Sequence, residues 1–184
     1  MTPTSPADDR VPPTIDMAGR VARFAELRFS RHGHLDTYLP GHEREIAAVI
    51  GPGVMEDPNH RPAIVAADGF NVTYARVEPG NGNALHDHKT VEVFIPLSGR
   101  WSFRWGEAGE HEVVLGAWDT ISIPPGVNRC YRNLGGETAC LLAIIGGSDP
   151  GEVVWARSVL EAAARRGVTL DERGQVRVRQ AAKG

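Results

Sequence analysis

The sequence predicts an all-β domain that carries an N-terminal extension and a short C-terminal helix. From Ala63 onward, short runs rich in β-branched and aromatic residues alternate with turn residues every eight to twelve positions. Glycine and proline punctuate these runs, and no long helical pattern interrupts them before Gly147. This texture is typical of an antiparallel sandwich or barrel.

Changes in composition divide the chain into four parts. The first part is polar and rich in proline without periodicity, which predicts a disordered tail. The second part is an extension of mixed strand and turn pieces, and its opening run MAGRVARFAEL has apolar residues at the spacing of a short amphipathic helix. A barrel and a C-terminal strand, helix and tail complete the chain. The predicted boundaries are 1–16, 17–62, 63–147 and 148–184.

The barrel region contains eight candidate strands. In the run RWSFRW, Trp101 and Phe103 alternate with polar residues, so one face of that strand is strongly apolar. The candidate strands are AIVAA, NVTYARVEP, ALHDHKTVEVFIPL, RWSFRW, HEVVLG, DTISIP, RCYRN and ACLLAIIG.

The chain beyond the barrel has its own signals. The run VVWA is expected to add an outer strand. Ser158 and Glu161 have the spacing of a capping box, which predicts that a helix begins there and ends at Gly167. The run VTLDERGQVRVRQ predicts an exposed hairpin or a frayed tail.

Composition excludes several classes of function. The formal net charge is −3, whereas a nucleic-acid surface requires clustered Lys and Arg in excess. No run of 18 apolar residues is present, so no membrane-spanning helix is expected. The N-terminus lacks the apolar stretch of a signal peptide, and we expect a cytoplasmic protein. Cys130 and Cys140 flank a turn symmetrically, which is compatible with a cross-strand disulfide but, in the cytoplasm, favours two reduced thiols.

The segment from Gly80 to Gly99 carries the strongest chemical signal. On one strand, His86, His88 and Glu92 would share a face, because side chains alternate with a period of two. Neighbouring Cα atoms on one face are about 6.6 Å apart, so two imidazoles can converge on one ion. Two histidines and one carboxylate suit Fe(II), Mn, Ni or Zn.

This segment resembles the first cupin motif, Gly-x5-His-x-His-x3-Glu-x6-Gly, at every fixed position. The matching residues are Gly80, His86, His88, Glu92 and Gly99. The second motif, Gly-x5-Pro-x-Gly-x2-His-x3-Asn, is matched at Pro124, Gly126 and Asn133. It departs at two positions, where Trp118 replaces the glycine and Arg129 replaces the histidine that would be the fourth metal ligand. The resemblance covers roughly residues 68–146 and implies a jelly-roll β-barrel that holds one divalent transition metal.

Arg129 is the departure that bears most on function. A guanidinium has no free lone pair for a metal, so a three-ligand site of His86, His88 and Glu92 would leave coordination positions open. If Arg129 points inward, we expect it to clamp a substrate carboxylate or phosphate. Tyr131 shares its face and can offer a phenol to substrate or oxygen, or simply fill the barrel.

The resemblance implies a metal-dependent enzyme that acts on a small, carboxylate-bearing molecule, with dioxygenase chemistry as the first hypothesis. The alternatives are a metal-poor cupin that binds or senses a small anion, and a metal-assisted lyase or isomerase. A homodimer is expected, because cupins often pair. Two other histidine signals receive little weight: His32-Gly-His34 is expected at the surface, and His111 is a weak candidate for a fourth ligand.

Overall fold

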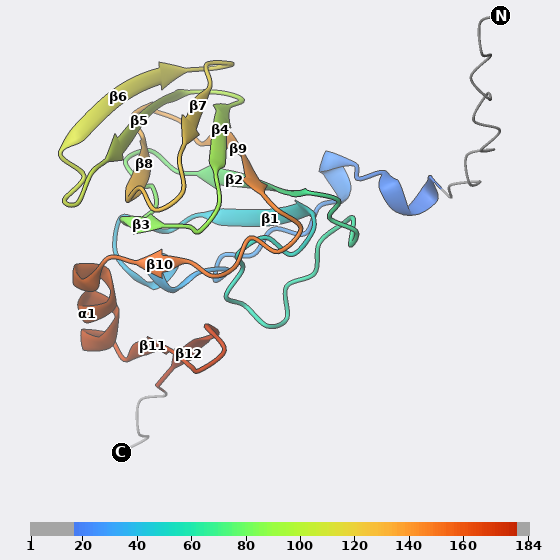
Figure 1. The fold of residues 1–184 in the computed structure, drawn as a ribbon. Coiled ribbons are helices and arrows are strands. Elements are labelled where there is room, and N and C mark those ends of the chain that lie inside the picture. Colours follow the sequence, from blue (N-terminus) through green and yellow to red (C-terminus); the bar gives the residue numbers. More distant parts are fainter. Residues whose placement is uncertain (1–16, 180–184) are drawn as a thin grey trace, which may run out of the picture.

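Two five-stranded antiparallel sheets pack face to face in the computed structural model, which describes residues 17–179 (Figure 1). The all-β prediction with one short C-terminal helix is therefore confirmed. The predicted disordered tail, residues 1–16, lies outside the described residues. Within residues 17–179, no helix is long and apolar enough to cross a membrane.

The first sheet has the strand order β1-β2-β9-β4-β7. Its longest ladder joins β2 to β9 over eight pairs, from Phe70 with Gly146 to Val77 with Ala139. The edge strand β1 of this sheet comes from the N-terminal extension. The barrel therefore begins earlier in the chain than the alternating strand and turn segments that predicted it. The strands are β1 Glu45–Ile50, β2 Phe70–Val77, β4 Glu92–Pro96, β7 Ile121–Ile123 and β9 Ala139–Gly146.

The second sheet has the order β10-β3-β8-β5-β6. In it, His86 on β3 lies directly opposite Arg129 on β8 and Trp155 on β10. The free cysteines Cys130 and Cys140 lie on strands of different sheets, not across one hairpin. The strands are β3 His86–Asp87, β5 Arg100–Trp105, β6 His111–Gly116, β8 Arg129–Asn133 and β10 Val154–Trp155.

An aromatic core joins the inward faces of the sheets. Trp101 and Phe103 are buried, as the alternation in RWSFRW predicts, and the Tyr131 ring meets Phe94, Trp101 and Phe103 at centroid distances of 5.6, 5.6 and 6.3 Å. Burial of such side chains contributes about 1.5–3 kcal/mol each. The core therefore fixes the position of β8 and of the residues that it presents.

The predicted helix at Met17–Leu27 is wrong. The chain there forms two separate 3-10 turns, η1 (Ala18–Arg20) and η2 (Phe24–Glu26). Val21 and Phe24 remain more than half exposed. A helix this short needs tertiary packing of its apolar face, and that face is not buried here.

A second apolar cluster joins segments of the N-terminal extension to the C-terminal part of the chain. It joins η3 (Leu35–Tyr38), β10, helix α1 (Arg157–Arg165) and the hairpin of β11 (Val168–Leu170) and β12 (Val176–Val178). Figure 1 shows α1 and this hairpin together beside β10. The outer strand and the hairpin were expected from the sequence.

The capping box is not formed, because the N-cap of α1 is Ala156 and no side chain caps it. Glu161 instead pairs with Arg157 one turn earlier. The helix does end before Gly167, whose φ of 75° lies in the left-handed region that glycine accepts readily.

Two predicted strands differ from the structure. In AIVAA, only Ile64 forms a bridge, to Ile50. The long run ALHDHKTVEVFIPL is not one strand: β3 ends at Asp87, residues 88–91 form an irregular connection, and β4 begins at Glu92 in the other sheet. Periodicity alone did not show this break, because both pieces have strand composition.

Candidate metal centre

Three buried side chains converge where the two sheets meet. Within residues 17–179, His86, His88 and Glu92 form the one cluster of His, Cys, Asp or Glu side chains whose ligand atoms all lie within 4.8 Å of one another. Each is at most 5% exposed. The three residues predicted as ligands are therefore together, although the shared strand face assumed for them is wrong. Glu92 reaches the cluster from the opposite sheet because the chain crosses over after His88.

The two histidines are in the state that a metal ligand needs. The Nδ1 of His86 lies 2.8 Å from the Ala84 carbonyl oxygen, a contact in which the ring donates its proton and leaves Nε2 with a free lone pair. Burial lowers the pKa of His86 well below its ordinary value, and Arg129 and His88 lower it further. Burial also lowers the pKa of His88, against the opposing effect of Glu92. Both rings are thus neutral near pH 7.

Arg129 is buried and is paired with a candidate ligand. Its Nε and one terminal nitrogen donate to the same oxygen of Glu92, Oε2, at 3.0 and 2.6 Å. The other terminal nitrogen donates to the Val127 carbonyl at 3.3 Å. The same Oε2 lies 3.6 Å from Nε2 of His88, so Arg129 is bonded to the carboxylate oxygen that faces this histidine. A guanidinium therefore stands beside the carboxylate at the position where the motif has a histidine.

The triad opens onto a small cavity between the sheets. Its volume is about 50 Å³, room for only a few water molecules. Most of the lining is apolar and includes Phe94, Leu141, Ile145 and Trp155; the polar lining residues include Arg44 and Tyr131 beside the triad. Such a cavity accepts a small ligand with few polar groups.

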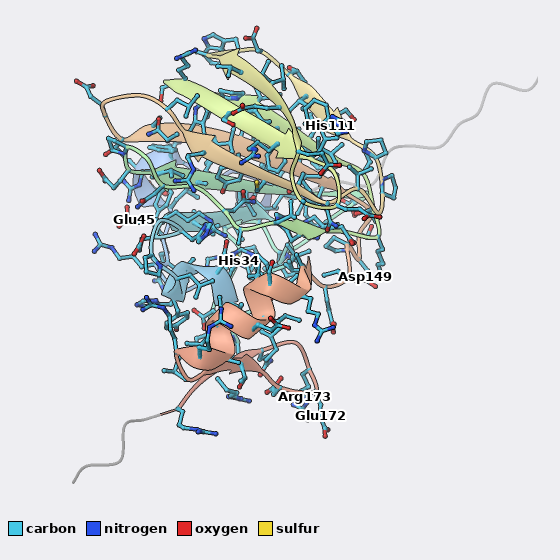
Figure 2. All side chains as sticks on the ribbon, turned by 90° about the vertical axis from the view of Figure 1, so that its left-hand side faces the viewer. His34, Glu45, His111, Asp149, Glu172 and Arg173 are labelled. Atoms are coloured by element: carbon cyan, nitrogen blue, oxygen red, sulfur yellow. The ribbon has the colours of Figure 1, made fainter. Side chains whose placement is uncertain are left out.

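The N-terminal extension supplies cavity residues that the sequence did not reveal. His34, expected at the surface, is buried, and its pKa lies well below the ordinary value because of burial and the nearby Arg44. Arg44 also lines the cavity and is buried against Asp36. Figure 2 places His34 between the sheets and helix α1. Neither residue belongs to a motif. Only the expectation that some polar residues of an irregular segment are buried could have identified them.

The two remaining site residues suggested by the sequence are His111 and Tyr131. His111 lies exposed at the start of β6, with its ring 5.7 Å from Trp105, and it does not line the cavity (Figure 2). The suggestion of His111 as a fourth ligand is wrong. Tyr131 is buried and lines the cavity beside the triad, so it is placed for either role expected of it.

Glu56 is a buried residue that positions Trp155, a neighbour of His86. Its two carboxyl oxygens accept hydrogen bonds from the indole of Trp155, at 2.7 Å, and from the main chain of Leu35, at 2.5 Å. The Trp155 ring in turn packs 5.3 Å from the ring of His86. Burial raises the pKa of Glu56 to about 7, with a smaller upward effect of Asp36 and opposing effects of the hydrogen bonds and of Arg44.

We expect Glu56→Gln to change how stability depends on pH. The unfolded chain releases this proton near pH 4.5 and the folded chain near pH 7, so the folded state holds more protons between these values. The contribution of Glu56 to the free energy of unfolding therefore falls as pH rises through this window, by about 3 kcal/mol. The wild type should exceed Glu56→Gln in stability at pH 5, and this gap should narrow by pH 8.

Urea unfolding at pH 5, 6, 7 and 8 measures the gap. Glu161→Gln is the matched control, because Glu161 is exposed on α1 and its variant should differ from the wild type by the same amount at each pH. A constant gap between the wild type and Glu56→Gln would show that Glu56 is ionised in the folded protein throughout.

Comparison with known proteins places this geometry in a family. A family model described as a cupin domain matches residues 73–145, which contain the whole triad and Arg129. No curated protein sequence matches the chain.

Several solved structures share the fold. The polyketide cyclase RemF from Streptomyces resistomycificus matches with a TM-score of 0.55 and 18% identity, over 73% of this chain and 82% of that one. The cupin-2 domain protein Rru_A2000 from Rhodospirillum rubrum gives 0.54 and 15%, over 77% and 86%. A structure described as the DMSP lyases RdDddP and RnDddQII gives 0.56 and 16%, over 71% and 63%.

Identities this low show a shared fold and leave the reaction open. The sheet order, the buried His/His/Glu cluster and the family match agree with one another. Residues 73–145 therefore form a cupin domain, as the two sequence motifs predict.

Proposed function

We propose that the protein is a metal-dependent enzyme that acts on a small organic anion, with dioxygenase-type oxidation as its first candidate reaction. The observation that carries this proposal is the buried triad of His86, His88 and Glu92, whose ligand atoms lie within 4.8 Å of one another and whose two imidazoles are neutral. Two histidines and one carboxylate suit non-haem Fe(II), and Mn, Ni and Zn accept the same donors. A metal bound there supplies Lewis acidity and a template for substrate.

The charges around the cavity favour an anionic substrate. Arg129 neutralises Glu92, and Asp36 neutralises Arg44, so the two buried ion pairs contribute no net charge. A divalent ion would therefore add two positive charges to a buried site, and uncompensated buried charge is costly. A substrate carboxylate would offset part of this charge. A direct contact of Arg129 with that carboxylate stays a prediction.

One observation favours the second candidate, a metal-poor protein that binds a small anion. The Arg129–Glu92 pair satisfies the buried carboxylate without a metal ion. If that pair persists in solution, Arg129 competes with the metal for Glu92. The alternative of lyase or isomerase chemistry draws support from the neighbours named for a cyclase and for lyases, which show that this fold also hosts non-oxidative reactions.

Oxygen consumption separates these candidates. Protein loaded anaerobically with Fe(II) is mixed with a panel of short carboxylates in an oxygen electrode, and NMR follows each carboxylate. We expect oxygen uptake with at least one acid, reduced by more than about 100-fold in His86→Ala. Product without oxygen uptake would favour the lyase or isomerase reading, and equal uptake by wild type and His86→Ala would contradict the proposal. The expected homodimer stays a prediction that the mass in solution tests.

A further inference from the structure

A second polar wall faces the cavity from outside the cupin motifs. Arg44, from the loop before β1, lines the cavity together with Tyr131 of β8. Its terminal nitrogens donate to the two carboxylate oxygens of Asp36, both at 2.9 Å. Asp36 also accepts from the main chain of Ala84, at 2.8 Å, two residues before His86. This cluster therefore ties the N-terminal extension to the strand that carries the first candidate ligand.

Stability alone explains this ion pair poorly. Arg44 and Asp36 are 6% and 0% exposed. Removing two charges from water costs several kcal/mol per ion, and well-packed apolar residues often serve as well or better. In addition, the Nε of Arg44 is buried without a hydrogen-bond partner in the described part of the chain. A buried cation held in place at a cavity wall indicates that this wall contacts a polar ligand.

Tyr131 is a second polar side chain of this cavity wall. The positive charge of Arg44 lowers the pKa of the Tyr131 phenol, but burial has the larger effect and raises it to about 12, so the phenol keeps its proton. A guanidinium has donors only, so Arg44 cannot accept the phenolic proton. The phenolic proton is then free to be donated to a ligand oxygen, and the nearby positive charge strengthens that donation.

We propose that the Tyr131 hydroxyl, supported by Arg44 and Asp36, is a subsite for a second, uncharged oxygen of the substrate. The proposal rests on the function proposed above, in which the substrate carboxylate lies near the triad. Asp36 already neutralises Arg44, so a hydroxyl or carbonyl oxygen fits this wall better than a second carboxylate, which would face Asp36. The small cavity requires that the two oxygen groups be only a few bonds apart. The substrate class is thus a short hydroxy or oxo acid.

Paired ligands of equal charge test this subsite. Zinc-loaded protein is titrated calorimetrically with propanoate and with 3-hydroxypropanoate, which differ only in the hydroxyl group. In the wild type we expect 3-hydroxypropanoate to bind about 10-fold more tightly, a value near the worth of one good hydrogen bond. In Tyr131→Phe the two acids should bind equally, and the affinity for propanoate should stay at its wild-type value.

The controls separate the subsite from folding and from the metal site. Tyr131→Phe keeps the ring that packs on Phe94 and Trp101. Tyr38→Phe removes a hydroxyl outside the cavity, where Tyr38 stacks on His32, and should keep the 10-fold preference. Equal binding of the two acids by the wild type, or a preference that survives in Tyr131→Phe, would overturn the subsite. Failure to bind zinc would instead contradict the proposed function. In that case, the same titrations on metal-free protein would test the subsite independently of the metal.

Discussion

Replacing His88 with alanine is expected to abolish binding of a divalent transition metal at the cupin centre. His88 is 1% exposed and contributes one of three ligand atoms that lie within 4.8 Å of one another. Loss of an outer partner of a metal ligand already costs 10–100-fold in affinity, so loss of a ligand should cost more than about 100-fold. Calorimetric titration of metal-free protein with Zn²⁺, and anaerobically with Fe(II), measures this loss against a wild type that binds about one ion per chain.

The control is another histidine of the same domain. His111→Ala removes an imidazole that is exposed on β6 and does not line the cavity, so its metal affinity should equal that of the wild type. Circular dichroism confirms that each variant is folded before titration. Equal metal affinity in His88→Ala and the wild type would place the metal elsewhere and remove the basis of the proposed enzyme.

The triad could be predicted from the sequence because motif spacing carries it. His86, His88 and Glu92 lie within seven consecutive residues, and a cupin chain brings such a segment to the barrel interior whatever the details of its path. The path itself was not predicted correctly. A single strand would align the three side chains on one face, whereas here Glu92 opens a strand of the other sheet. Strand periodicity describes faces, and it does not show where a chain changes sheets.

The residues that the N-terminal extension contributes in and around the site could not be predicted. His34, Arg44 and Glu56 come from a region without motif or clear periodicity, and long-range contacts bury them. Glu56, for example, bonds to the indole of Trp155, 99 residues further along the chain. A sequence pattern indicates local propensity and amphipathic faces. It does not indicate such contacts between distant segments. The surface prediction for His34 failed for this reason.

Arg129 is buried, and its partner in the structure is Glu92. Arg129→Met is expected to destabilise the metal-free protein by about 3–5 kcal/mol, because Glu92 would remain as a buried charge without its cation. Urea unfolding of metal-free protein measures this change. The double variant Arg129→Met/Glu92→Gln, which removes both charges, should recover most of the lost stability. If Arg129→Met alone is as stable as the wild type, the ion pair does not form in solution.

The same substitution should tighten metal binding. Two effects compete: Arg129 helps to hold Glu92 in place, an outer-partner role worth 10–100-fold in affinity, or about 1.4–2.8 kcal/mol. Against this, a guanidinium about 5 Å from a divalent ion is repelled by about 7 kcal/mol at an effective dielectric constant of about 20. Repulsion is the larger effect, so Arg129→Met should bind Zn²⁺ at least about 10-fold more tightly than the wild type.

Arg129→His restores the histidine of the cupin motif. Both variants remove the repulsive charge, but only His adds a lone pair, so affinity for Zn²⁺ should rise in the order wild type, Arg129→Met, Arg129→His. Equal affinity in the two variants would mean that position 129 acts through charge alone. Weaker binding in Arg129→Met than in the wild type would mean that holding Glu92 outweighs repulsion. If both variants bind metal more tightly but lose turnover, the positive charge of Arg129 serves the anionic substrate, at the expense of metal affinity.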